Sequence, residues 1–400
     1  MTLAENKAKP ADDANLLPAS PAPAVKRHLV LLGAGHAHVH VLHGLAQDRP
    51  ADLAITLVAP HARQLYSGMV PGFVAGHYTL DNCMIPLEGL LARCGARYVQ
   101  GSATGLDADS RTVTLASGAT LPFDWLSLNT GPVMDREKIE AQMPGAREHA
   151  LFVRPIEAFG QLWPRVMAMA RQKKIHLVVI GAGAAGLELA MAAAHALKGA
   201  SFAPGSGVTL LSGAQPPGAS YPAGVQRRIA RALQRLRIEV LLDTCVGVDA
   251  GGVHLGNGQR LACDVPLLAL GAQAPAWLAG SGLALDKAGF VAVNAFQQST
   301  SHPAVFAAGD VASRVDAPHA RSGVYAVRAG PPLLANLRAA WHGQPLKPYL
   351  PQKRTLNLLS CGGRHAIAVW DGLSVEGAWV WRWKDRIDRQ FVAAYARATG

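Results

Sequence analysis

Two glycine-bearing turns, each set between a hydrophobic strand and a helix, constrain the fold of this chain more than any other feature. The second turn lies in IHLVVIGAGAAGLELA, where a β-branched run precedes Gly181, Gly183 and Gly186 and an alanine-rich helix follows. Gly181 permits the tight turn, Gly183 lets a pyrophosphate approach the backbone, and Gly186 lets the helix pack closely on the strand. This order predicts a dinucleotide-binding unit with the phosphates at the helix N-terminus.

The first turn lies in RHLVLLGAGHAHVHVLHGLA and repeats this layout around Gly33 and Gly35. His38 stands where the third glycine would be. Because the third glycine serves helix packing more than phosphate contact, the stretch still predicts a dinucleotide turn. His36 and His40 share one helical face and could form a metal pair. No nearby carboxylate or cysteine completes a ligand set, so we predict no metal.

Composition bounds the class of protein. The chain has 400 residues, half of them hydrophobic, which predicts two or three domains. The formal net charge of +11 suits anionic partners, but no basic stripe interleaved with aromatics indicates nucleic-acid binding. Five scattered cysteines without C-x-x-C spacing argue against a zinc knuckle or a local redox pair, and they favour a reducing, cytoplasmic location.

Two segments raise the question of targeting. Residues 1–25 are rich in alanine and proline and have no apolar core of signal-peptide length, so we predict a disordered leader. Residues 177–197 are apolar over a length that could span a bilayer. Because this stretch opens as a β-branched strand and turns through glycines, we predict a strand and helix of a folded domain instead.

Three more strand endings follow the first turn, in PFDWLSLNTGP, DVPLLALGAQAP and HPAVFAAGDVA. They end in Thr130 and Gly131, in Gly271, and in Gly309 and Asp310. The order of all these motifs resembles the two-dinucleotide-binding flavoprotein superfamily, also called the pyridine nucleotide-disulfide oxidoreductase family. The joint order is far more specific than any single motif.

The resemblance implies an α/β fold with two Rossmann-like domains, the first turn holding FAD and the second NAD(P)H. It divides the chain into a split FAD domain, residues 26–150 and 285–340, an inserted NAD(P)H domain, residues 151–284, and a C-terminal interaction region, residues 341–400. Asp310 would hydrogen-bond the ribityl chain of FAD. The helix after it would direct its N-terminus at the flavin, where a positive helix end stabilises the negative charge of the reduced ring.

The residues expected at the two cofactors share positions in these motifs or in the helix starts beside them. The two histidines of the first turn would line the helix start or pack beneath the flavin. The full set is Gly33, Gly35, His36, His38, Pro71, Thr130, Gly131, Gly181, Gly183, Gly186, Gly271, Gly309 and Asp310.

Within the superfamily, ITLVAPHARQLYSGMVPGFVAGHY is similar to the matching region of type II NADH dehydrogenases and sulfide:quinone reductases. The chain resembles still more closely a subgroup that some organisms join to selenide, water dikinase. This implies an FAD-dependent NAD(P)H oxidoreductase that passes hydride to flavin and electrons to a quinone or another small acceptor. The alternatives are an accessory flavoprotein of selenium metabolism working with selenide, water dikinase, and a sulfide or selenide oxidase using Cys361 and a second cysteine.

The chain departs from the family pattern at both ribose positions. Ala59 and Pro60 stand where an acid would take the adenosine ribose of FAD, and Ser212 stands where glutamate would indicate NADH. The choice between NADH and NADPH stays open, with Gly186 favouring NADH. Glu188 is expected either near the nicotinamide side of the flavin or as a solvated acid on its helix.

Two residue types that related enzymes use at the electron acceptor, a cysteine pair and glutamines, are absent from the matching positions of this chain. Residues 36–80 contain no cysteine, so a thiol–disulfide relay in the helix after the FAD turn is not expected. Type II NADH dehydrogenases place glutamines beside the quinone where this chain has Val324 and Arg328. Tyr325 and Arg328 are therefore candidates to flank the flavin or to bind a polar acceptor, and Arg328 could instead offset a nearby acid.

The segment WVWRWKDRIDRQFVAAYARA predicts an amphipathic helix. Trp383, Ile387, Phe391 and Tyr395 follow one another at steps of four, with arginines mostly on other faces. Such a helix either lies in a membrane surface or packs its apolar stripe on the body of the protein. The first alternative predicts a cytoplasmic protein held peripherally on the inner face of the membrane.

Overall fold

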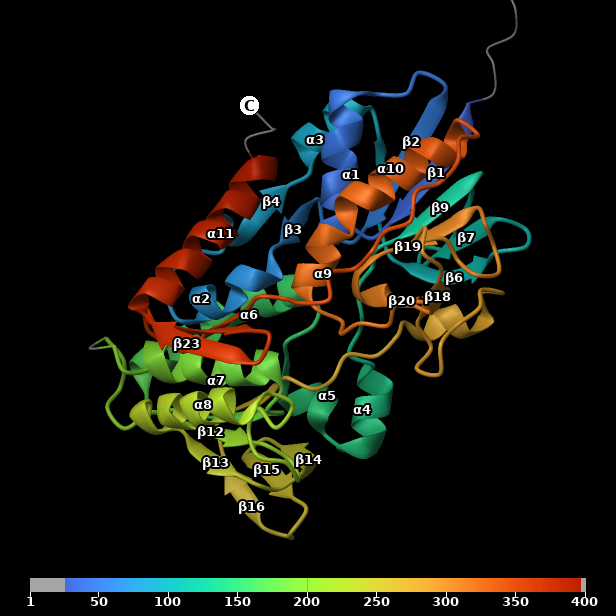
Figure 1. Cartoon of the computed structure of the whole chain (residues 1–400). Coiled ribbons are helices and arrows are strands. Elements are labelled where there is room, and N and C mark those ends of the chain that lie inside the picture. Colours follow the sequence, from blue (N-terminus) through green and yellow to red (C-terminus); the bar gives the residue numbers. More distant parts are fainter. Residues whose placement is uncertain (1–25, 200, 397–400) are drawn as a thin grey trace, which may run out of the picture.

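Two five-stranded parallel sheets form the body of the protein in a computed structural model that describes residues 26–199 and 201–396 (Figure 1). The first has the order β19 (Val305–Ala307), β9 (Trp125–Leu128), β1 (Arg27–Leu32), β2 (Leu53–Ala59), β5 (Arg97–Gln100). The second has the order β10 (Leu151–Phe152), β17 (Val265–Leu268), β11 (His176–Ile180), β12 (Gly207–Leu211), β13 (Glu239–Leu241). Strands from before and after the second sheet in the chain thus meet in the first sheet.

The two units repeat one architecture in detail. In each unit, a three-stranded antiparallel meander comes just before one inner strand of the parallel sheet. In the first unit, β6 (Ala103–Asp107), β7 (Thr112–Leu115) and β8 (Thr120–Pro122) precede β9. In the second unit, β14 (Cys245–Asp249), β15 (Gly252–Leu255) and β16 (Arg260–Ala262) precede β17. In both units the ring of a histidine on the central strand hydrogen-bonds to a carbonyl of its meander through Nδ1 and to a threonine hydroxyl through Nε2, and its backbone N–H donates to an aspartate. These trios are His28, Thr56 and Asp124, and His176, Thr209 and Asp264.

Helices cover the sheets as the hydrophobic patterns require. On the first unit, α1 (His36–Gln47) packs against α3 (Glu88–Cys94), α9 (Gly323–Arg328) and α10 (Gly330–Trp341). On the second, α7 (Ala184–Ala196) contacts β11, β12 and also α2 (Val70–Val74) of the first unit. An apolar helix such as α7 must be covered on all sides, and eight of its residues are buried. The stretch 177–197 is therefore β11 and α7, as predicted.

The remaining elements connect or flank these layers. They are α4 (Arg136–Gln142), α5 (Ala146–His149), α6 (Ile156–Gln172), α8 (Ala223–Arg235), the paired strands β3 (Arg63–Leu65) with β4 (Met84–Pro86) and β18 (Val291–Val293) with β20 (Ala312–Arg314), and the 3-10 turns η1 (Ser67–Met69), η2 (Asp81–Cys83), η3 (Ala276–Gly280) and η4 (Gly309–Val311).

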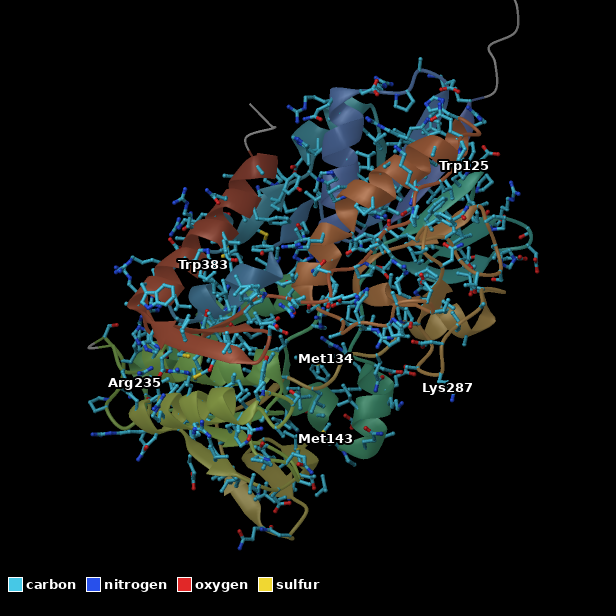
Figure 2. All side chains as sticks on the ribbon, in the orientation of Figure 1. Trp125, Met134, Met143, Arg235, Lys287 and Trp383 are labelled. Carbon is cyan, nitrogen blue, oxygen red and sulfur yellow. The ribbon has the colours of Figure 1, made fainter. Side chains whose placement is uncertain are left out.

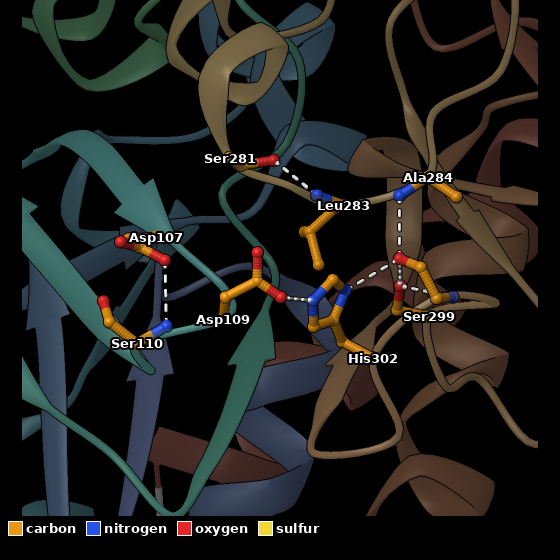
Figure 3. A network of polar contacts seen from close by, with 9 residues as sticks. Asp107, Asp109, Ser110, Ser281, Leu283, Ala284, Ser299 and His302 are labelled. Atoms are coloured by element: carbon orange, nitrogen blue, oxygen red, sulfur yellow. Dashed lines mark hydrogen bonds and ion pairs between the residues drawn. The ribbon is translucent and has the colours of Figure 1, made fainter.

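A network of polar contacts joins the segment before β19 to the turn between β6 and β7 (Figure 3). His302, just before β19, bonds through Nε2 to Asp109 in the β6–β7 turn at 3.0 Å and through Nδ1 to the Ser301 hydroxyl at 2.8 Å. The same hydroxyl accepts from the Ala284 backbone N–H at 2.9 Å. These bonds hold the segment that carries Gly309 and Asp310 in register with β9.

The C-terminal tail consists of an antiparallel meander, β21 (Asn357–Ser360), β22 (Ala366–Trp370) and β23 (Leu373–Gly377), followed by α11 (Ala378–Ala396). The meander contacts α7 and α8, whereas α11 contacts β4 and α1 (Figure 1). One segment thus bridges both units. Within residues 26–199 and 201–396, no helix combines the length and apolarity needed to cross a bilayer. The predicted leader lies outside the described residues.

Candidate functional site

The first glycine turn is held against the end of β9. The Gly33 N–H donates to the Val58 carbonyl at 2.8 Å, and the Gly35 N–H donates to the Asn129 carbonyl at 3.1 Å. Gly33 has φ +89°, and a Cβ placed there would lie 2.5 Å from the Thr130 Cα. Only glycine fits such a backbone beside such a neighbour. The turn therefore brings Thr130 and the N-terminus of α1 together, as a diphosphate site requires.

His38 explains how this turn forms without its third glycine. Its side chain is fully buried, and Nδ1 donates to the Gly33 carbonyl at 2.6 Å while Nε2 accepts from the Ser127 hydroxyl at 2.8 Å. Burial lowers the pKa of His38 to about 4, so the ring is neutral at physiological pH. His38 is thus a brace between the turn and β9.

His36, at the first position of α1, is covered by the tail. Its ring meets Tyr66 edge-on at 5.3 Å and lies 5.9 Å from the ring of Phe391 on α11. Tyr66 and Phe391 stack at 4.5 Å, and the Ser67 hydroxyl lies 3.4 Å from His36 Nε2. Burial, aided by the charge of Arg154, lowers the pKa of His36 to about 4. The FAD turn predicted from sequence is therefore walled by η1 and α11.

Gly309 and Asp310 lie in η4, beside Asn129, whose side-chain N–H donates to the Ala308 carbonyl at 2.6 Å. Among the described residues, no side chain or backbone group hydrogen-bonds to the half-buried Asp310 carboxylate, and no cation pairs with it within 4 Å. Burial raises the pKa of Asp310, and the nearby charge of Arg154 opposes that rise. Asp310 lines a cavity, so its carboxylate, which has no partner in the described part of the chain, could accept a hydrogen bond from a ribityl hydroxyl of FAD.

Arg154 is a candidate that the sequence analysis missed. It lies just after β10, the edge strand of the second sheet, and its charge acts on both His36 and Asp310. No carboxylate within the described part of the chain pairs with it inside 4 Å. A guanidinium near a helix N-terminus fits a diphosphate, so Arg154 would hold the phosphates of FAD with α1. In the sequence, Arg154 is only a lone basic residue within VRP, and no motif marks it as a phosphate ligand.

The second glycine turn leaves open space beside two of its glycines, where a dinucleotide could bind. The Gly181 N–H donates to the Leu211 carbonyl at 2.9 Å, and Gly181 has φ +110°. A Cβ at Gly186 would run into the Gly181 carbonyl, whereas positions beside Gly183 and Gly271 are open. The Cβ-free space at these two glycines suits a pyrophosphate against the N-terminus of α7. At the end of β12, the Ser212 hydroxyl donates to the Gln215 carbonyl.

Glu188 is not a solvated acid. Its side chain is half-buried on α7, and its Oε1 accepts from the Ser360 backbone N–H of the tail at 2.7 Å. Burial raises the pKa of Glu188, and the charge of Lys384 on α11 opposes the rise. The acid thus lies where α7 and the tail meet, on the side of the second turn that faces the first unit.

Tyr325 lines a cavity that also contains Gly309 and Asp310, whereas Arg328 is not among the residues that line it. The Tyr325 ring stacks on His319 at 4.0 Å, and its hydroxyl donates to the Gln352 carbonyl at 3.2 Å. Arg328 is exposed, and its charge acts on Tyr349. Both lie on the side of α9 toward residues 349–352. Pro71 is buried in α2, between the two units.

The remaining histidines and cysteines have structural settings. His40 Nδ1 lies 3.1 Å from the Tyr395 hydroxyl, and His43 bonds to Gln47. No three His, Cys, Asp or Glu side chains within residues 26–199 and 201–396 are grouped to hold a metal ion. All five cysteines are free thiols, and burial raises the pKa of Cys361 to about 12.

Comparison with known proteins fits this geometry. Residues 27–330 match the family model described as pyridine nucleotide-disulphide oxidoreductase. An NADH dehydrogenase-like protein of Mycobacterium tuberculosis is 29% identical over 305 residues, covering 73% of this chain and 74% of that protein. The type II NADH:quinone oxidoreductase NdhA of the same organism is 25% identical, with 72% and 66% covered.

Two solved structures share the fold. The sulfide:quinone oxidoreductase of Aquifex aeolicus superposes with a TM-score of 0.76 at 17% identity, covering 93% of this chain and 92% of that one. NDH2 of Plasmodium falciparum in complex with NADH superposes with a TM-score of 0.75 at 12% identity, covering 93% and 99%. The arrangement of two dinucleotide units predicted from the motifs is thereby confirmed.

Proposed function

Because this chain belongs to the pyridine nucleotide-disulphide oxidoreductase family, we propose that it passes electrons from NAD(P)H through FAD to a quinone. It is an FAD-dependent NAD(P)H oxidoreductase. Quinone as the acceptor is supported by relatives named for quinone reduction and by the absence of a cysteine pair beside the FAD turn. The observation that carries the proposal is the pair of glycine cradles at α1 and α7, each at the C-terminal edge of a parallel sheet.

The residues present divide the work as follows. The N-terminus of α1 and Arg154 would hold the diphosphate of FAD, and Asp310 would accept a hydrogen bond from its ribityl chain. Gly181, Gly183 and the N-terminus of α7 would hold the diphosphate of NAD(P)H. FAD supplies the chemistry that accepts hydride and passes electrons on. The protein contributes orientation and exclusion of water, to which Tyr66 and Phe391 add by covering His36.

We further propose that the tail attaches the protein to an anionic membrane surface. Trp379 and Trp383 stack on the outer side of α11 and are 51% and 41% exposed (Figure 2 labels Trp383). The apolar surface continues through other exposed residues of α11 and the meander, which are Trp370, Leu373, Val375 and Ile387. Exposed arginines of α11 flank this strip, and the chain carries a net charge of +11. Tryptophan beside cations is typical of helices that lie in a membrane interface.

The four apolar residues predicted to form one stripe on α11 do not all face the same way: some face solvent and the others pack on the body of the protein. Trp383 and Ile387 face outward, whereas Phe391 and Tyr395 pack on the body. Each step of four residues advances about 40° around a helix, so the three steps from Trp383 to Tyr395 turn the stripe by about 120° and carry it off one face. The helix can therefore pack on the protein and still present tryptophans to lipid.

The test is anaerobic reduction followed by a screen of acceptors. FAD-loaded protein should bleach on addition of NADH or NADPH and regain its colour with a soluble quinone. Polysulfide, products of selenite reduction and oxygen are the comparison acceptors. Bleaching without quinone-dependent recovery would refute the quinone proposal and favour an accessory role with selenide, water dikinase. Protein that takes up no flavin would refute the whole assignment.

A further inference from the structure

The end of β12 lies directly beside the second glycine turn. The Gly181 N–H donates to the Leu211 carbonyl at 2.9 Å, and Ser212 is the first residue beyond this strand. In dinucleotide-binding units an acid about 20 residues or more after the glycines accepts a hydrogen bond from the 2′-hydroxyl of the adenosine ribose. NADH and NADPH carry the same dihydronicotinamide ring and differ only in a phosphate on that 2′ oxygen. The surroundings of Ser212 therefore govern the choice between them.

The connection from β12 to α8 is uncharged and open at its start. Residues 212–222, SGAQPPGASYP, contain no acid and no base. The Ser212 hydroxyl donates to the Gln215 carbonyl, so this side chain closes a turn of its own segment. Gly213 has φ +68°, and no atom of the described residues lies within 4 Å of a Cβ placed there. The strand thus ends in a hydroxyl and open backbone, which leave space for an added phosphate.

The acid at the end of the neighbouring strand β13 is directed away from this connection. The Asp243 carbonyl accepts from the Gly213 N–H at 2.9 Å, so the backbones of the two strand ends are adjacent. The Asp243 carboxylate instead accepts from the Thr244 N–H at 2.7 Å and from the Asn257 N–H, in the turn between β15 and β16, at 3.3 Å. Neither the connection after β12 nor Asp243 therefore places a carboxylate at the ribose.

The arginines of α8 are not arranged as a phosphate clamp at Ser212 either. Arg228 and Arg231 both bond to Glu376 of the tail, at 2.8 Å and 2.7 Å. Arg227 is exposed and lies along the first turn of α8, where its Nη2 is 3.9 Å from the Cβ position of Gly224. The 2′ position of the ribose would thus meet neither a fixed negative charge nor a fixed positive one.

Packing also explains Gly186 without reference to the donor. A Cβ there would run into the Gly181 carbonyl, so the close approach of α7 to the turn requires glycine whichever donor binds. We propose that the second cradle accepts NADPH and NADH with similar efficiency, because Ser212 neither repels nor clamps a 2′-phosphate. This inference rests on the proposed function, whose hydride donor it specifies. A carboxylate bonded to the 2′-hydroxyl contributes roughly 10-fold to 100-fold in binding, and this chain lacks that preference.

The experiment compares both donors on the FAD-loaded protein. Anaerobic stopped-flow reduction of the flavin gives a second-order rate constant for NADH and one for NADPH. Calorimetric titration with NAD⁺ and NADP⁺ gives the two affinities without turnover. In wild-type protein the two values of each pair should agree within about tenfold. Ser212→Glu should lower the NADPH-to-NADH ratio roughly 100-fold in both measurements, because a carboxylate accepts from the 2′-hydroxyl and repels the phosphate.

Two control variants separate the charge of the new side chain from its size and from its general field. Ser212→Gln adds the bulk of glutamate without its charge, and Ser220→Glu adds the charge eight residues further along the same connection. Both should keep the wild-type ratio.

A wild-type preference of more than about 100-fold for either donor would overturn the proposal. An unchanged ratio in Ser212→Glu, or an equal shift in Ser220→Glu, would overturn it as well. If Ser212→Glu fails to fold, the wild-type ratio decides alone. FAD-loaded protein whose flavin is reduced by neither donor would overturn the proposed function instead.

Discussion

Restoring the missing glycine of the first turn should destabilise the protein. His38→Gly re-creates the G-x-G-x-x-G fingerprint but removes the brace between the turn and β9. The Gly33 carbonyl and the Ser127 hydroxyl would each lose a buried hydrogen-bond partner. Each such loss costs about 1–3 kcal/mol, and glycine inside a helix costs about 1 kcal/mol more.

We therefore expect the free energy of unfolding to fall by at least about 3 kcal/mol, even if water enters the vacated space. Urea unfolding of the FAD-loaded and FAD-free proteins, followed by circular dichroism, measures this difference. Ser127→Ala, which removes only the partner of Nε2, should cost about 1 kcal/mol and provides the control.

The opposite result would be informative. If His38→Gly unfolds at the same urea concentration as wild type, or a higher one, and retains FAD equally well, the ring is not a brace. The third position would then tolerate glycine as other turns of this kind do, and our account of the first turn would be wrong.

Three further outcomes are expected. On folding, the pKa values of the partly buried His36 and the fully buried His38 fall from 6.5 to about 4. The stability that the neutral rings contribute should therefore be fully present above pH 6.5 and decline as the pH falls toward 4, by up to about 3 kcal/mol for each ring, and urea unfolding across this range measures the decline. Arg154→Met should weaken FAD binding roughly tenfold or more while Arg154→Lys weakens it less, measured by fluorescence of released FAD. Replacing Trp379 and Trp383 together by serine should reduce binding to anionic vesicles in a sedimentation assay without lowering NADH oxidation by ferricyanide, and equal vesicle binding would contradict the membrane proposal.

The parts of the fold that follow from local backbone requirements could be predicted from sequence. Gly33 and Gly181 need positive φ next to a neighbouring strand, and that need is visible in the motif itself. The same is true of the 177–197 stretch, where a β-branched run and glycines distinguish a strand and helix from a membrane span.

Contacts between distant segments could not be predicted in this way. Lys384 and Asp388 stand four residues apart on a helix with many charges, a spacing that usually indicates an exposed pair, and only the packing of α11 on η1 buries them. Arg154 gave no motif because its importance depends on two partners, His36 and Asp310, that are far away in the chain. Glu188 was ambiguous until the tail supplied the Ser360 N–H.

The bridging tail has a consequence for how the molecule melts. Its meander is tied to the second unit through Arg228 and Glu376 at 2.8 Å, while α11 is tied to the first through Tyr78 and Asp385. Neither nucleotide-binding unit can unfold without breaking its contacts with the C-terminal tail that both units share. Heating should therefore produce one cooperative transition, and NADH added to the second cradle should raise the melting temperature reported by flavin in the first.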